Sequence, residues 1–192
     1  MAKKDIILSG VGGQGILSIA TVIGWAALDQ NLHLKQAEVH GMSQRSGSVV
    51  TYVRYGEHVY SPIIEQGEAD MIISFEQLEA ARWLPYLKEG GKVVVSTQMI
   101  DPMPVITGAM DYPQDLIAKM RAAGADVDGV DALQLAEQAG SAKAVHIVLM
   151  GRVSRYFDFP LDPWHQALAE SVPSEFTELN RKAFASGANG QD

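Results

Sequence analysis

The stretch that decides the fold is SGVGGQGIL, residues 9 to 17, which directly follows the apolar run at residues 6 to 8. An apolar run bounded by glycine predicts a short buried strand, here over residues 5 to 9. Apolar residues then recur over residues 16 to 30 and predict a helix that needs cover on more than one side. A second strand is predicted over residues 34 to 39. The order strand, glycine loop, helix and strand indicates a doubly wound α/β protein.

The glycine loop is also a candidate ligand site. Gly10, Gly12 and Gly15 match the G-x-G-x-x-G spacing after a strand and before a helix. Backbone N–H groups and the dipole of the following helix can hold a phosphate or another anion. The alternative is that the glycines only permit a sharp turn and close packing of the helix on the sheet. The candidate binding residues are Gly10, Gly12, Gly13, Gln14 and Gly15.

A second polar loop, HGMSQRSGS, covers residues 40 to 48 and is expected beside the glycine loop. Its Arg45 can clamp a phosphate or carboxylate of a ligand, or a carboxylate of a neighbouring subunit. The alternative is a solvated loop with an exposed arginine. His40 is a weaker candidate for acid/base catalysis, because a single histidine without a carboxylate partner is more often a structural hydrogen-bonding group. The candidate binding residues here are Ser43, Gln44, Arg45 and Ser46.

The rest of the chain predicts more strands and then mostly helices. The stretch VVTYVRYGEHVYSPII, residues 49 to 64, looks like a β-hairpin that turns at Gly56-Glu57. Further strands are expected over residues 71 to 75 and 92 to 96, with a helix broken near Pro85 between them. Gly90-Gly91 reads as a turn. Helices are predicted over residues 113 to 123, 132 to 139, 142 to 156, 163 to 170 and 174 to 185.

These elements predict an α/β fold: a Rossmann-like, doubly wound, mostly parallel sheet with a β-hairpin insertion and a helical C-terminal part. A length of 192 residues suits a single domain over residues 1 to 192. Within it we expect a sheet core over residues 1 to 100, a mainly helical part over residues 113 to 186, and a frayed tail over residues 187 to 192.

Composition excludes several classes of function. The net charge is −8 and there is no dense run of Lys or Arg, which argues against nucleic acid as a partner. The chain has no cysteine, so it cannot hold an iron–sulfur cluster through thiolates or act as a thiol enzyme. The scattered histidines suggest no metal site. No segment reaches the roughly 18 to 20 apolar residues of a membrane helix, so a cytoplasmic location is expected.

The chain resembles a known family over nearly its whole length. The segments that carry the resemblance are GVGGQGI, AEVHGMSQRSGSVVTYVRYG, YLKEGGKVVVSTQMI and ELNRKAFASG, in this order. They resemble the gamma-type domain of the 2-oxo acid:ferredoxin oxidoreductases. Among these, the small (beta) subunit of the indolepyruvate enzyme is most similar, followed by the gamma subunit of the 2-oxoglutarate enzyme.

The resemblance implies a role in the oxidative decarboxylation of a 2-oxo acid to an acyl-CoA, with electrons passing to ferredoxin. Thiamine diphosphate, magnesium and iron–sulfur clusters are implied for a larger partner subunit, because this chain has neither cysteines nor a motif for magnesium and diphosphate. The two polar loops are implied to help seat coenzyme A or the substrate, with Arg45 as the charged anchor. The chain alone is not expected to be active.

Two alternatives stay open from the residues. A nicotinamide-dependent enzyme is suggested by the glycine spacing and by Glu38, which lies near the position where an acidic residue contacts the ribose hydroxyls. A stand-alone module that binds a nucleotide or a CoA-like anion without catalysis is also consistent with the two loops. The extra Gly13 and the predicted hairpin depart from a plain dinucleotide fold.

Overall fold

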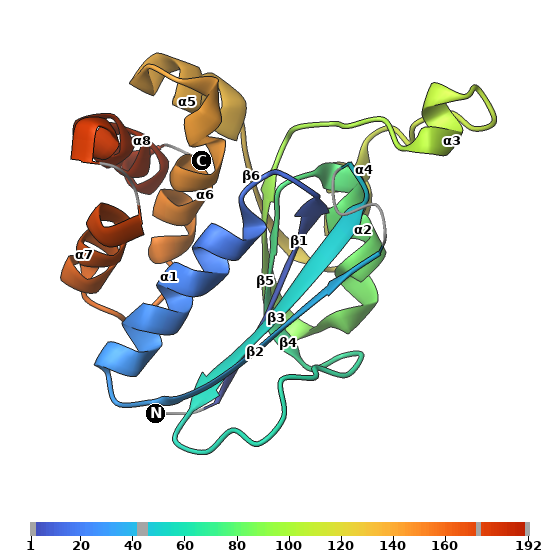
Figure 1. The fold of residues 1–192 in the computed structure, drawn as a ribbon. Helices are drawn as coiled ribbons and strands as arrows, with labels where there is room; N and C mark the ends of the chain where they lie inside the picture. Colours follow the sequence, from blue (N-terminus) through green and yellow to red (C-terminus); the bar gives the residue numbers. More distant parts are fainter. Residues whose placement is uncertain (1–2, 42–45, 172–173, 191–192) are drawn as a thin grey trace.

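The computed structural model describes residues 3–41, 46–171 and 174–190. In these residues a single mixed sheet of six strands lies between two layers of helices (Figure 1). Across the sheet the strands follow the order β2-β3-β1-β4-β5-β6. The strands are β1 (Lys4–Val11), β2 (His33–His40), β3 (Ser48–Gly56), β4 (Ala69–Ser74), β5 (Leu87–Ser96) and β6 (Asp126–Val130). The predicted α/β fold with a mostly parallel sheet is confirmed.

Strand β3 is the departure from a plain doubly wound sheet. It lies between β1 and β2 and runs antiparallel to both, while β1, β4, β5 and β6 are parallel to one another. The antiparallel insertion is therefore present, but the hairpin predicted around Gly56-Glu57 is wrong. Residues 57 to 68 form no strand, since Pro62 cannot donate to a ladder and Tyr60 and Ile63 lie exposed.

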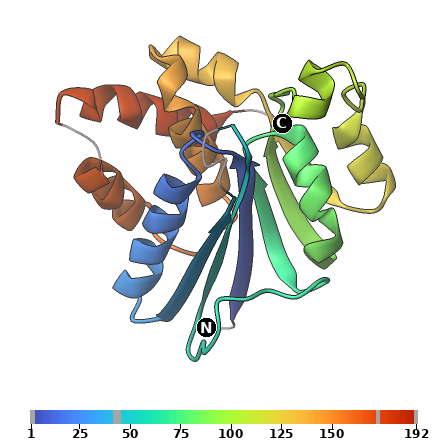
Figure 2. The same cartoon turned by 45° about the vertical axis from the view of Figure 1, so that its right-hand side comes forward.

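Helices cover the two faces of the sheet unequally, as Figure 2 shows from the side. The larger layer packs on the face that contains Ile6, Leu8 and Val94, and the smaller one on the face that contains Ile7, Val93 and Val95. The larger layer consists of α1 (Ile16–Asp29), α5 (Ala132–Ala139), α6 (Val145–Ser154), α7 (Leu161–Ser171) and α8 (Thr177–Asn189). The smaller layer consists of α2 (Gln77–Trp83) and α4 (Leu116–Ala122). Outside both layers lies α3 (Met103–Ile106).

Short 3₁₀ turns join several of these elements. The helix expected to break near Pro85 does so: α2 is followed by η1 (Leu84–Tyr86). In the C-terminal part, η2 (Ala142–Ala144) leads into α6 and η3 (Ser174–Phe176) leads into α8. Within the described residues, no helix is long and apolar enough to cross a membrane.

Two local predictions in the sheet need correction. Residues 126 to 130, expected in a helical region, form strand β6, which pairs with β5 and buries Val127 and Val130. Gly90-Gly91 is not a free turn but lies inside β5. There the pairing with β4 shifts between Ala69 and Met71, and Gly90 takes a φ of 72°. The additional residues between Leu87 and Lys92 therefore form a bulge in β5.

The C-terminal helix extends further than expected. Helix α8 continues to Asn189, so residues 187 to 189 are helical instead of frayed. A Cβ atom on Gly187 would lie 1.9 Å from the carbonyl oxygen of Val148, and one on Gly151 would lie 2.0 Å from that of Phe184. Glycine at both positions lets the backbones of α6 and α8 touch, and this contact fixes the end of the chain against the core.

Candidate functional site

The candidate site lies at the carboxyl ends of the parallel strands β1 and β4, whose following helices pack on opposite faces of the sheet. After β1 the chain enters α1 on one face of the sheet, and after β4 it enters α2 on the other face. The two strands are neighbours, so their two loops diverge and leave a crevice between them. Ligands of open α/β sheets bind at this kind of switch point.

The glycine loop forms one wall of this crevice. Gly13 and Gly15 have positive φ angles of 99° and 87°, and Gly15 is the N-cap of α1. A Cβ on Gly10 would lie 2.8 Å from the side-chain oxygen of Gln14, and one on Gly15 would lie 2.8 Å from His146. The glycines are therefore required for the turn and for close packing. Whether the loop also holds a ligand depends on its free donors.

Several polar groups of the loop are already used within the chain. The Gln14 side chain accepts from the Val11 N–H at 2.7 Å and donates to the Phe75 carbonyl at 3.1 Å. The Gly12 N–H donates to the Gly47 carbonyl at 2.8 Å. Among the described residues, no hydrogen-bond acceptor faces the backbone N–H of Gly13 or Gly15. These two groups and the first turn of α1 are the donors that stay open to a ligand.

Gly13, Gly15 and the first turn of α1 line a cavity of about 420 Å³ that the sequence did not predict. Besides the glycine loop, Lys143 and His146 from the region where η2 meets α6 line this cavity. Burial lowers the pKa of His146 below its ordinary value, opposed by a backbone hydrogen bond at Lys143. His146 is therefore neutral near pH 7, whereas Lys143 supplies a positive charge. No local sequence signal joins these residues to the glycine loop, which lies far away in the chain.

The described end of the second polar loop, residues 46 and 47, lies beside the first loop, as expected. The Ser46 N–H donates to the Gly12 carbonyl at 3.3 Å, and Ser46 takes a φ of 66°. The predicted binding residues Ser43, Gln44 and Arg45 lie outside the described residues. His40 is exposed at the end of β2, with Nδ1 3.3 Å from the carbonyl oxygen of the next residue, Gly41. Its contacts give no geometric support to a catalytic role.

Two buried acidic residues, Glu76 and Glu79, line a cavity next to the second loop. Glu76 is the N-cap of α2, and its carboxylate accepts from the Glu79 N–H at 2.9 Å. Glu79 accepts from the Ser48 hydroxyl at 2.6 Å and pairs with Arg82. Burial raises the pKa of Glu79, opposed by the Ser48 hydrogen bond and the Arg82 charge. A cavity of about 240 Å³ lies between these residues, the second loop and residues 100 to 103.

Glu38 does not lie where a nicotinamide enzyme needs its acidic residue. It is exposed on β2, where its register partner on β3 is Thr51. Thr51 in turn pairs with Leu8 of β1, so a whole strand separates Glu38 from β1. Adjacent strands lie about 4.8 Å apart, which places Glu38 roughly two strand spacings from the strand that carries the glycine loop. The inserted strand β3 thus removes the main support for a nicotinamide site.

Another cavity, of about 250 Å³, lies at the opposite end of the sheet. Lysines and aromatic residues line it, but Lys88 pairs with Asp70, and Lys92 pairs with Asp126. The described part of the chain contains no group of three or more His, Asp or Glu residues that could hold a metal ion. The crevice at the carboxyl ends therefore remains the candidate for ligand binding.

Comparisons with known proteins bear on what this crevice serves. The family model described as pyruvate ferredoxin/flavodoxin oxidoreductase matches residues 5–190. The chain is 41% identical to the indolepyruvate oxidoreductase subunit IorB of Pyrococcus horikoshii, over 97% of this chain and 95% of that protein.

Solved structures share the fold at lower sequence identity. The keto/oxoacid ferredoxin oxidoreductase gamma subunit of Geobacter sulfurreducens superposes with a TM-score of 0.71 at 21% identity, over 96% of both chains. The 2-oxoglutarate:ferredoxin oxidoreductase of Magnetococcus marinus, with 2-oxoglutarate, coenzyme A and succinyl-CoA bound, gives a TM-score of 0.75 at 19% identity. That match covers the whole of this chain but 32% of the longer chain.

Proposed function

Because the chain belongs to the pyruvate ferredoxin/flavodoxin oxidoreductase family, we propose that it is the small subunit, without redox centres of its own, of an indolepyruvate:ferredoxin oxidoreductase. In this reaction an aryl 2-oxo acid loses carbon dioxide, its acyl group passes to the thiol of coenzyme A, and the electrons pass to ferredoxin. The observation that carries the proposal is the match to IorB, which spans both chains almost from end to end.

The redox chemistry belongs to a larger partner subunit that carries thiamine diphosphate, magnesium and iron–sulfur clusters. This chain has no cysteine to hold a cluster. The sequence also lacks a Gly-Asp-Gly motif with a downstream Asn that would hold magnesium and diphosphate. Thiamine diphosphate and magnesium are therefore assigned to the partner subunit. The assembled enzyme acts in the cytoplasm, without nucleic acid or membrane as a partner.

The part of the reaction left to this chain is to seat an anionic group of coenzyme A or of the 2-oxo acid. Gly13, Gly15, Ser18 in the first turn of α1 and Lys143 line the same cavity. Together they combine backbone donors, a helix dipole and one cation, which is the donor set of a phosphate or carboxylate site. His146 is neutral there and can share a hydrogen bond without a change in charge.

The two polar loops contribute the remaining residues of the proposed site. Ser46 lies against Gly12 at the edge of the crevice, and Arg45 directly precedes Ser46 in the chain. We assign Arg45 the role of a second cation for the same anion. We also propose that residues 1 to 192 form one gamma-type domain, because the six strands of the described residues belong to a single sheet. The proposed binding residues are Gly10, Gly12, Gly13, Gln14, Gly15, Ser43, Gln44, Arg45 and Ser46.

Co-expression with the larger subunit encoded by the same organism tests the proposal. We expect a complex that contains thiamine diphosphate and iron–sulfur clusters and that reduces ferredoxin with indolepyruvate and coenzyme A. Parallel assays with pyruvate and with 2-oxoglutarate identify the 2-oxo acid. A chain that stays a monomer or homo-oligomer beside the larger subunit would contradict the proposal. Saturable binding of NADH to the isolated chain would instead support the nicotinamide alternative.

Binding of coenzyme A to the assembled complex tests the crevice itself. Lys143→Met removes the cation next to the glycine loop, and we expect the dissociation constant of coenzyme A to rise about tenfold, as for one charge-assisted hydrogen bond. Lys119→Met is the control, because Lys119 is exposed on α4 in the other helical layer. If both variants bind coenzyme A like the wild type, Lys143 does not contact it.

A further inference from the structure

One segment of the chain leaves the body of the molecule. Residues 101 to 111, here called the arm, follow β5 and precede α4, and they contain α3. Figure 1 shows α3 at the end of an excursion away from the sheet and from both helical layers. The arm does not pack in either helical layer, so packing of the core does not explain why it extends outward.

The arm presents apolar side chains to solvent. Met103, Ile106 and Met110 are each exposed to about two thirds, at 66%, 65% and 65%. From Pro102 to Met110 the sequence carries no charged residue, although a fifth of the whole chain is charged. Exposed apolar groups that gather in this way mark an interaction surface. The flexible methionine side chains suit a surface that must adapt to a partner.

The arm is also ordered before any partner binds. The carbonyl oxygen of Pro104 accepts from the Ala109 N–H at 2.8 Å and from the Met110 N–H at 3.1 Å. Gly108 closes the turn after α3 with a φ of 73°. A segment held in one conformation loses less conformational entropy on binding. The apolar groups therefore form a preformed surface.

Both ends of the arm are fastened to one carboxylate. The same oxygen of Glu76, a residue only 1% exposed, accepts from the Ile100 N–H at 3.2 Å and from the Tyr112 hydroxyl. Glu76 is the N-cap of α2 and lines the cavity beside the second polar loop. Residues at the base of the arm, Asp101 and Met103, line that cavity too. The arm is thus anchored in the crevice and extends outward from it.

We propose that the arm is the docking segment for the larger, cofactor-carrying subunit, which receives Ile106 and Met110 in an uncharged apolar groove. This inference rests on the proposed function. In the Magnetococcus protein the same fold makes up 32% of one chain, so about two thirds of that chain lies outside this fold. In the proposed complex the larger subunit supplies the corresponding mass, and an uncharged apolar arm at the mouth of the crevice provides a contact for it. Docking then closes the cavity on the side of the arm.

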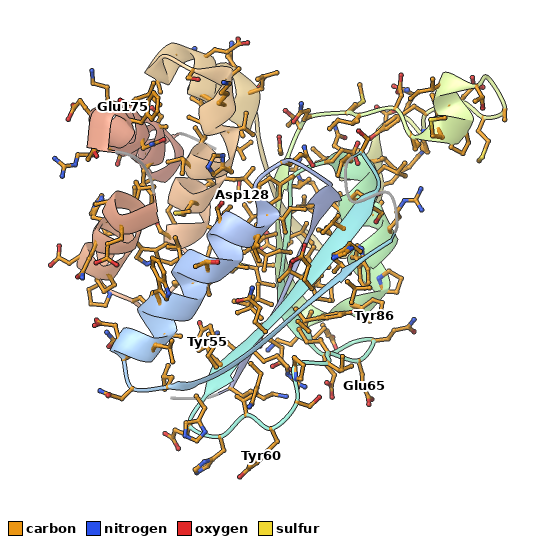
Figure 3. All side chains as sticks on the ribbon, viewed as in Figure 1. Tyr55, Tyr60, Glu65, Tyr86, Asp128 and Glu175 are labelled. Carbon is orange, nitrogen blue, oxygen red and sulfur yellow. The ribbon has the colours of Figure 1, made fainter. Side chains whose placement is uncertain are left out.

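The test is assembly with the larger subunit, with variants that leave the cavity unchanged. Ile106→Ser/Met110→Ser alters only the outer part of the arm. Tyr60→Ser/Ile63→Ser is the matched control, because these residues are also exposed, at 86% and 53%, on the loop at the opposite end of the sheet (Figure 3). We expect the arm variant to bind the larger subunit at least tenfold more weakly, while the control binds like the wild type. Thermal unfolding of each isolated chain shows that both variants are folded.

The outcomes separate this inference from the proposed function. If the arm variant assembles as well as the wild type, the inference is wrong and the proposed function stands. If the wild-type chain itself binds no larger subunit, the proposed function fails and the inference fails with it. If size-exclusion chromatography instead shows a dimer of this chain that the arm variant loses, the arm binds a second copy and the assigned partner is wrong.

Discussion

Asp128, in the edge strand β6, and Glu76, directly after β4, are both buried carboxylates, but their partners differ. Asp128, at 8% exposure, accepts from Arg152 at 2.6 and 2.7 Å and from the Tyr156 hydroxyl at 2.5 Å (Figure 3). In the described part of the chain, the Glu76 carboxylate accepts from neutral groups: two backbone N–H groups and a tyrosine hydroxyl. One carboxylate belongs to a charge pair and the other to a set of neutral donors.

The difference separates structural stability from function. Asp128 joins β6 to α6, and Arg152 also donates to the carbonyl of Gly190 near the end of the chain, so this cluster ties the C-terminal helices to the sheet. Glu76 ties α2 to the two ends of an exposed arm next to the crevice. Changes around Asp128 should therefore act mainly on the free energy of unfolding, and changes around Glu76 mainly on the arm and its partner.

The largest expected effect is that of Arg152→Met. It leaves the buried carboxylate of Asp128 without its cation, which costs about 3 to 5 kcal/mol of the free energy of unfolding. Denaturant unfolding of the isolated chain measures the loss. Arg155→Met is the control, because Arg155 is exposed one turn further on, and it should change the free energy of unfolding by less than about 1 kcal/mol. Equal losses in the two variants would contradict the structural role of Asp128.

The next effect in size concerns the contact of α6 with α8. In Gly187→Ala the new methyl group would overlap the carbonyl oxygen of Val148, and the helices must move apart. Overpacking of this kind costs about 1 to 3 kcal/mol, which thermal or denaturant unfolding detects. Gly190→Ala is the control, since its nearest neighbour would lie at 3.1 Å. A Gly187→Ala chain as stable as the wild type would show that the two backbones do not touch.

Glu76→Gln should lower the free energy of unfolding less than the two preceding variants do. Its main effect should be to weaken the attachment of the arm. The amide keeps one acceptor oxygen but loses the charge that strengthens the bonds from Ile100 and Tyr112, at about 1 to 2 kcal/mol. Faster hydrogen exchange at the Ile100 amide and weaker binding of the larger subunit are the readouts. The exposed Glu175→Gln serves as a control. Unchanged exchange at Ile100 would show that Glu76 does not hold the arm.

Sequence alone predicted the parts of the fold that depend on local patterns. The strand, glycine loop and helix around Gly10, the broken helix at Pro85 and the contact of residues 46 and 47 with the glycine loop are confirmed. The pairing of β3 with β1 was missed, because a buried strand pairs with whichever neighbour the whole sheet offers. The convergence of Lys143 with the glycine loop was missed for the same reason, since it depends on how α6 packs. No local pattern records these distant contacts.

The smallest expected effects are those of pH on the free energy of unfolding. The contributions of Asp128 and Glu79 should change with pH in opposite directions. Arg152 and Tyr156 outweigh the effect of burial and hold the pKa of Asp128 below its ordinary 3.8, so its contribution to stability is present above that pH and is lost as the pH falls further. Burial raises the pKa of Glu79 above its ordinary 4.5, so the folded chain binds this proton more tightly than the unfolded chain. The contribution of Glu79 is therefore lost as the pH rises above 4.5 through the raised pKa.

Glu79→Gln tests this opposite sign directly. Unfolding of both proteins is measured from pH 3 to pH 8, about five pH units that include the ordinary pKa values of Asp and Glu. The free energy of the wild type minus that of the variant should decrease as the pH rises above 4.5, because only the wild type must desolvate a buried charge. Below pH 3.8 both proteins should lose stability together, since both keep Asp128. A difference that instead increases above pH 4.5 would mean that Ser48 and Arg82 stabilise the charged form of Glu79 more than burial opposes it.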